Sequence, residues 1–246
     1  MPASPLVAGG FVVLPLAVAT MFVLAGLRAD RRLGTRPGAR RRRAWLIALG
    51  TLAWLAVTWL AAASGVLRRF DAIPPPFAFF LLAVLVLGVA VPLSPLGGRL
   101  VRTLPMWALV GSQVFRFPLE LLMHRAYVEG VMPVQMSYSG RNYDIVTGAT
   151  AGLLACWLAA GPVPRAVVAA WNVLGLALLA NIVTVAVLST PLFRAFGDDR
   201  LNVFVAYPPF VWLPGILVTA ALMGHVLVWR KLAATRGLAD TPRRAS

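Results

Sequence analysis

The chain has 246 residues, of which 60% are hydrophobic and 13% charged, and its mean hydropathy is +0.81. A soluble domain is about half apolar and about a quarter charged, so this composition excludes a water-soluble globule. A formal charge of +15 would suit a protein that binds nucleic acid. The basic residues, however, are distributed in the pattern typical of segments that lie beside a membrane surface. We therefore expect no nucleic-acid partner.

Long apolar runs bounded by charged residues or prolines predict seven membrane spans, because a bilayer crossing takes about 20 apolar residues. The runs cover residues 6–27, 45–66, 77–96, 105–128, 144–160, 165–190 and 208–230. We expect an all-α fold, with residues 1–246 forming a single polytopic domain built as a bundle of seven transmembrane helices. Residues 233–246 are predicted to be a disordered cytoplasmic tail.

The basic residues predict the orientation of this bundle. Of the 23 Lys and Arg residues, 16 fall on one side of the predicted spans, five on the other and two inside the fourth span. The positive-inside rule then places the N-terminus outside and the C-terminus inside. Eight arginines lie in the 28–44 connection, and the partner we expect for them is the anionic headgroup layer of the bilayer.

The fourth span carries a polar stripe. At 100° per residue, five of its side chains fall within about 80° of one another on the helix. They are Gln113, Arg116, Glu120, His124 and Tyr127. Charged groups in hydrocarbon cost several kcal/mol unless they face protein or water, so the stripe should face the bundle interior.

Within the stripe, Glu120 is four residues from both Arg116 and His124, a spacing that allows pairing along the helix. Pro118 removes one backbone hydrogen bond and predicts a kink there. The stripe is interpreted either as a site for an anionic or proton-coupled ligand or as an ion pair that fixes the bundle's register.

Residues outside the fourth span could complete this site. Counting 1.5 Å per residue along the sixth span places Asn181 at the depth of Glu120, so we favour Asn181 over Asn172 as a partner. Asp144 is predicted to cap the fifth span, with pairing to Arg141 or Arg125 as the alternative.

Three further features belong to the same outer half. Asn142 lies in a connection rich in Gly, Ser and Asn, a composition typical of turns. Trp212 is read as part of an interfacial aromatic belt or, alternatively, as a pocket wall. The fifth span also has a face of small residues suited to close helix packing. That face is made of Gly148, Ala151, Gly152 and Ala155.

The sequence argues against the common cofactors of helical membrane proteins. Depth counting places His124 near the outer face and His225 near the inner one, too far apart to ligate one haem. The only lysine, Lys231, lies at the inner end of the last span, which excludes a retinal Schiff base within the bundle. No metal-binding motif is present, and we expect neither cofactor nor metal.

Two segments stand out as motifs. The first is the Phe115-Arg116-x3-Glu120-x3-His124 helix followed by Gly140-Arg-Asn142-Tyr-Asp144. The second is residues 208–232, with Phe210-Val-Trp212-Leu-Pro214 and His225. Together they resemble an uncharacterised family of bacterial multi-pass integral membrane proteins. The resemblance implies a fold of one unit in a bacterial cytoplasmic membrane and no particular activity. It groups the stripe with Asn142, Asp144 and Trp212.

Three functions are left open by the sequence. The first is binding or transport of a small anionic molecule or lipid, with Arg116 holding the anionic group and Glu120 or His124 exchanging a proton. The second is an intramembrane enzyme acting on a lipid or isoprenoid, with Glu120 as acid/base. The third is a structural or accessory subunit in which the stripe only holds helices together. The sequence assigns no catalytic residue and no oligomeric state.

Overall fold

A computed structural model of the chain describes residues 3–239, which form helices and connections without a strand. Five helical segments are long and apolar enough to cross a membrane. They are α1 (Pro5–Arg32), α2 (Pro37–Ala63), α3 (Pro76–Leu93), α8 (Arg165–Leu188) and the last segment, Leu213–Thr235. The all-α, membrane-type architecture expected from composition is therefore confirmed.

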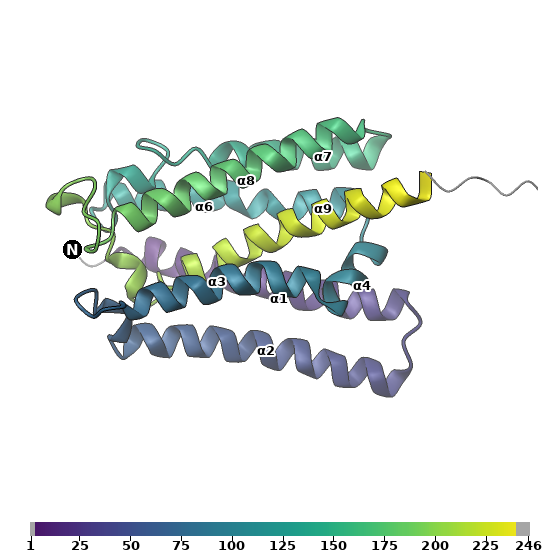
Figure 1. Cartoon of the computed structure of the whole chain (residues 1–246), viewed down its shortest axis with the longest axis horizontal. Coiled ribbons are helices and arrows are strands. Elements are labelled where there is room, and N and C mark those ends of the chain that lie inside the picture. The colour runs from purple at the N-terminus through teal and green to yellow at the C-terminus, as the bar shows by residue number, and fades with distance from the viewer. Residues whose placement is uncertain (1–2, 240–246) are drawn as a thin grey trace, which may run out of the picture.

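Four of the remaining α-helices are shorter, and the fifth, α9, completes the last apolar segment. These five are α4 (Pro95–Thr103), α5 (Met106–Gly111), α6 (Arg116–Val128), α7 (Ile145–Ala160) and α9 (Thr219–Ala239). In Figure 1, α9 runs through the middle of the bundle, with α6, α7 and α8 on one side and α1 and α3 on the other. Helix α2 lies outermost, beyond α1 and α3. The N-terminus lies at one end of the bundle and the α1–α2 connection at the other.

The predicted fourth span is interrupted. Helix α5 ends at Gly111, a 3₁₀ turn covers Ser112–Phe115, and α6 begins at Arg116. Proline has no N–H and its ring crowds the carbonyl four residues earlier, which for Pro118 belongs to the 3₁₀ turn. The distortion expected at Pro118 is therefore present, one turn before the proline itself.

The last span begins later than predicted. Residues 208–211 form turns, a π-helix covers Leu213–Val218 and α9 continues to Ala239. A proline disfavours the helical conformation of the residue before it, as Pro209 does for Pro208, and the continuous helical segment begins only at Leu213. Helix α9 continues through residues 233–239, which belong to the segment predicted as a disordered tail, 233–246. Residues 240–246 lie outside the described part.

Two other boundaries differ from prediction. The Arg-rich connection shrinks to residues 33–36, because α1 extends to Arg32 and α2 begins at Pro37. Most of these arginines therefore sit on helix ends. The predicted span 77–96 ends at Leu93, where Ser94 caps the separate helix α4 and Pro95 begins it.

The small-residue face of α7 packs closely against neighbouring helices, as its composition predicted. A Cβ at Gly148 would collide with the backbone of Arg116 and Phe117, so glycine allows α7 to approach the start of α6 directly. Ala155 lies close to Gly111 in α5 in the same way. This contact places the N-terminus of α7 beside Arg116.

Candidate functional site

Arg116 is the centre of a buried polar cluster. Its side chain is 1% exposed and it forms a two-pronged ion pair with Asp144, the residue just before α7. Its Nε donates to Oδ2 of Asp144 at 2.7 Å and its Nη2 to Oδ1. Nη2 also approaches the carbonyl of Gly175 at 3.4 Å. Nη1 approaches the Gln113 Oε1 at 3.5 Å and contacts His225 Nε2 at 2.7 Å. All five guanidinium N–H donors are thus directed at acceptors.

The contacts of His225 define its protonation. Arginine can only donate, so His225 Nε2 accepts from Arg116 and carries no proton. The other ring nitrogen, Nδ1, then donates to Asn172 Oδ1 at 2.7 Å. Asn172 Nδ2 in turn donates to the His225 backbone carbonyl at 3.1 Å. His225 is therefore neutral, in a tautomer assigned by its two partners.

Glycine makes room for this arrangement in α8. A Cβ at Gly175 would collide with the imidazole ring of His225. The same glycine offers its carbonyl to Arg116. Glycine is therefore required at position 175 for the placement of the imidazole, and a larger residue would displace the ring.

Glu120 is buried in the same cluster without a cation of its own. Its side chain accepts a hydrogen bond from Asn142 Nδ2 at 2.7 Å. Asn142 also donates to the Met136 carbonyl, and its Oδ1 accepts from the Asp144 backbone N–H. Asn142 therefore fixes the loop that precedes α7 and sets Asp144 and Glu120 in one neighbourhood.

A cavity adjoins the cluster. Its volume is about 70 Å³, and Arg116, Glu120 and Asp144 lie on its wall among mostly apolar side chains of α3, α6, α8 and the π-helix. A buried water needs about 10–15 Å³ of such volume, so the cavity has room for a few waters or for a ligand of a few non-hydrogen atoms. It is too small for a lipid chain.

Five of the eight predicted site residues come together in this cluster: Gln113, Arg116, Glu120, Asn142 and Asp144. Their pairing differs from the prediction, because Arg116 binds Asp144 rather than Glu120, and Glu120 binds Asn142 rather than His124. Asp144 precedes α7 at the N-cap position, but its carboxylate makes no capping hydrogen bond. The carboxylate of Asp144 pairs instead with Arg116 in the protein interior.

The other three predicted residues lie elsewhere. His124 stacks on Tyr138 and contacts Ser139, at the loop end of α6. Asn181 donates to the carbonyl of Arg141. The helical wheel and the depth count gave the direction and depth of these side chains, but not the neighbouring segments that they contact.

Trp212 is a core residue. It is 9% exposed, its Nε1 donates to the Leu55 carbonyl, and its ring packs against Trp59. Trp212 therefore belongs neither to an interfacial aromatic belt nor to the wall of the cavity, because the turn before the π-helix directs its ring toward α2.

Sequence reasoning missed His225 and chose Asn181 where the structure uses Asn172. The predicted depths of Arg116 and His225 were incompatible with contact. Counting from Leu213 instead of residue 208 moves His225 about 7.5 Å back toward the centre of the bundle and brings it near Arg116. The turn chemistry of Pro208 and Pro209 was the available signal for this later start.

Comparison with models of protein families, with curated proteins and with solved structures gives no match for this chain. The site is therefore interpreted from its own geometry. Within the described residues, no three His, Cys, Asp or Glu side chains are grouped so as to hold a metal ion.

Proposed function

We propose that this protein binds and transports a small anion together with a proton through the Arg116 cluster. The observation that carries the proposal is the pairing of Arg116 with Asp144 beside a cavity that Glu120 also lines. Arg116 is occupied by the protein's own carboxylate, so a ligand must exchange with Asp144 rather than add to a free cation.

Charge balance links this exchange to a proton. Arg116 and Asp144 together are neutral, and His225 is neutral because its Nε2 accepts from Arg116. An uncompensated charge in an apolar interior is costly, so an anion that replaces Asp144 on the guanidinium favours protonation of the displaced carboxylate. Glu120, without a cation of its own, is placed on the same cavity wall to supply or accept that proton.

Irregular helices support a transport role. The 3₁₀ turn precedes Arg116 and the π-helix lines the cavity, and such interruptions at membrane depth occur where backbone lines a functional cavity. We place the chain in a bacterial cytoplasmic membrane as seven spans with the N-terminus outside. The positive-inside rule and the resemblance to bacterial multi-pass proteins support this placement.

The cavity volume favours a small ligand over the lipid or isoprenoid substrate of the enzymatic alternative. In the structural alternative the cluster only holds helices together. That alternative predicts no coupled entry of an anion and a proton, so a transport experiment separates the two.

The test uses the full chain in liposomes that contain a pH-sensitive dye, with inward gradients of chloride, nitrate or methanesulfonate. Coupled entry of an anion and a proton acidifies the interior. We expect acidification with at least one of these anions and a rate lower by about tenfold or more in Glu120→Gln, because the amide cannot exchange a proton.

His124→Gln is the matched control, since it removes a titratable group one turn away that lies outside the cluster. It should acidify at the wild-type rate. A folded Glu120→Gln protein as active as wild type, or folded wild type inactive with all three anions, would contradict the proposal and favour the structural alternative.

A further inference from the structure

A second cavity, much larger than the first, lies between α1, α2, α5 and the last apolar segment. Its volume is about 890 Å³, within the range of about 300–1,000 Å³ typical of ligand pockets. It shares no lining residue with the cavity beside Arg116. We propose that this groove binds an acidic glycerophospholipid, with an acyl chain between the helices and the headgroup phosphate on a rim of arginines.

The groove exists because the first half of α2 packs only in part against its neighbours. The buried residues of α2 are Leu55, Thr58 and Ala62, all in its second half. Just before them in the chain, Trp54 donates from Nε1 to the Gly215 carbonyl at 2.7 Å and so fastens α2 to the last segment. Between Trp54 and the α1–α2 connection, the inner side of α2 lines the groove, with Ile47 close to Gly26 of α1.

The interior of the groove suits a hydrocarbon chain. Its walls are mostly apolar side chains. The hydroxyls among them are already bonded: Thr51 donates to the Ile47 carbonyl, Ser112 to Leu109 and Thr219 to Gly215. Hydroxyls that bond their own helix leave little demand for a polar ligand deep in the groove. Apolar contact is what remains to stabilise an occupant.

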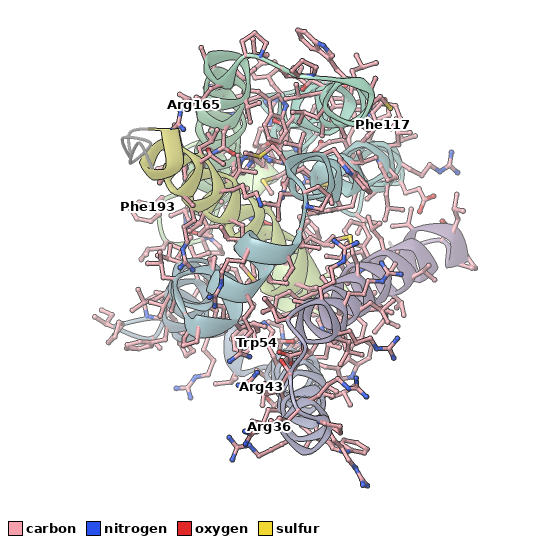
Figure 2. The ribbon with its side chains drawn as sticks, turned by 90° about the vertical axis from the view of Figure 1, so that its right-hand side faces the viewer. Arg36, Arg43, Trp54, Phe117, Arg165 and Phe193 are labelled. Atoms are coloured by element: carbon pink, nitrogen blue, oxygen red, sulfur yellow. The ribbon has the colours of Figure 1, made fainter. Side chains whose placement is uncertain are left out.

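The rim is cationic. Four arginines from three helices line the groove: Arg28, Arg42, Arg43 and Arg99. Figure 2 views the bundle from this end, with Arg43 and Trp54 on the side of α2 that faces the other helices. Four arginines with one nearby carboxylate, Asp30, leave an excess of three positive charges at the rim, which suits a phosphate headgroup.

Asp30 arranges part of this rim in advance. Its carboxylate is 1% exposed and its Oδ1 lies 3.2 Å from Arg43 Nη1 and 3.5 Å from Arg99 Nη1. These arginines come from α2 and α4 and keep exposed fractions of 32% and 19%. Arg28 and Arg42 are exposed and form no side-chain hydrogen bond or ion pair with residues 3–239. Two arginines are thus held in place and two are free to close on a phosphate.

Native mass spectrometry of the full chain in detergent, titrated with phosphatidylglycerol or phosphatidylcholine, tests the headgroup. The test variant is Arg28→Gln/Arg42→Gln. Its control, Arg40→Gln/Arg41→Gln, removes the same charge from exposed residues that do not line the groove. We expect phosphatidylglycerol to bind wild type in preference to phosphatidylcholine, and its affinity to fall by about tenfold in the test variant only.

A second pair of variants tests the acyl chain. Gly50 lines the groove and has open space beside it, so Gly50→Phe places a ring where the chain would lie. Gly38→Phe makes the same change in α2 away from the groove, also into open space. We expect Gly50→Phe to lower retention of phosphatidylglycerol and Gly38→Phe to leave it unchanged. Added glycerophosphoglycerol, the headgroup without chains, should not compete.

Four results would overturn the proposal. They are equal binding of the two lipids, equal loss in both double-arginine variants, full retention in Gly50→Phe, and competition by the free headgroup. Because the two cavities share no lining residue, none of these results bears on proton-coupled transport at Arg116.

Discussion

Three of the protein's arginine–carboxylate sites differ clearly in burial, and their differences show what each can do. Arg116 and Asp144 are 1% and 6% exposed, and every donor of the arginine is used inside the protein. Asp30 is equally buried, but its arginines keep exposed edges. Arg125 and Glu129 form an i,i+4 pair in which the arginine is 55% exposed.

The comparison separates sites that enclose a charge from sites that present one. An enclosed pair strongly resists the loss of either partner, because the remaining charge is left without solvent or counter-ion. A partly exposed site can lose a partner and recruit water or another anion. We expect stability effects to follow this order.

The largest effect is expected for Asp144→Asn. This change keeps the side-chain shape but leaves the Arg116 charge unpaired, so the free energy of unfolding should fall by about 3–5 kcal/mol. Chemical unfolding in detergent, followed by circular dichroism, measures this loss. The double variant Arg116→Gln/Asp144→Asn should recover part of it, because neither charge is then present.

The same variant connects stability with the proposed function. If an anion can take the place of Asp144 on the guanidinium, nitrate should stabilise Asp144→Asn more than wild type. Equal stabilisation of both proteins would argue against anion access to Arg116. A double variant no more stable than Asp144→Asn would show that the ion pair is not the source of the loss.

An intermediate effect is expected for Arg43→Gln. Asp30 keeps Arg99 at 3.5 Å and a contact from the Thr35 hydroxyl at 3.4 Å, and Arg43 is 32% exposed in the folded protein. The loss should therefore be about 1 kcal/mol, measured in the same unfolding experiment. A loss as large as that of Asp144→Asn would mean that the two buried carboxylates are equivalent, and would break the comparison.

The sequence predicted the parts of this architecture that depend on periodicity and composition. The apolar runs located the membrane-type helices, and the glycine and alanine positions on α7 predicted a close helix contact, which the structure places against α6 at Gly148. Asp144 was included among the predicted site residues, but its partner, Arg116, was not identified. A helical wheel gives the direction of a side chain within one helix and does not identify the neighbouring helix.

Irregular backbone accounts for the misplacement of His225. The turns at residues 208–211 delay the last helix, which shifts the predicted depth of His225 by about 7.5 Å, more than one helical turn, and separates it from Arg116. The choice of Asn181 over Asn172 has a different cause, since both lie on the regular helix α8 and depth alone does not identify a side chain's partner. The prolines at positions 208 and 209 are visible in the sequence, but the turn geometry they produce depends on the packing around them.

The smallest effect is expected at the exposed site, and it should depend on pH. The backbone N–H of Ser4 donates to Glu129 at 2.9 Å and its hydroxyl donates at 2.8 Å, and these bonds, more than Arg125, lower the pKa of Glu129 below its ordinary value. A lowered pKa in the folded state means that the contribution to stability is present above the ordinary pKa and disappears as the pH falls through the folded-state value.

Ser4→Ala removes the hydroxyl donor and keeps the backbone donor, so it should lower the unfolding midpoint slightly at neutral pH. This difference from wild type should shrink in acid, where Glu129 is protonated in both proteins. Thermal unfolding of the two proteins at neutral and acidic pH measures it, with Arg125→Gln as the comparison for the weaker ion pair. A Ser4→Ala effect independent of pH would assign the stabilisation to capping of α1, because the same hydroxyl also accepts from the Val7 N–H at 3.3 Å. The exposed site would then contribute nothing through its charge, which would widen the contrast with Arg116.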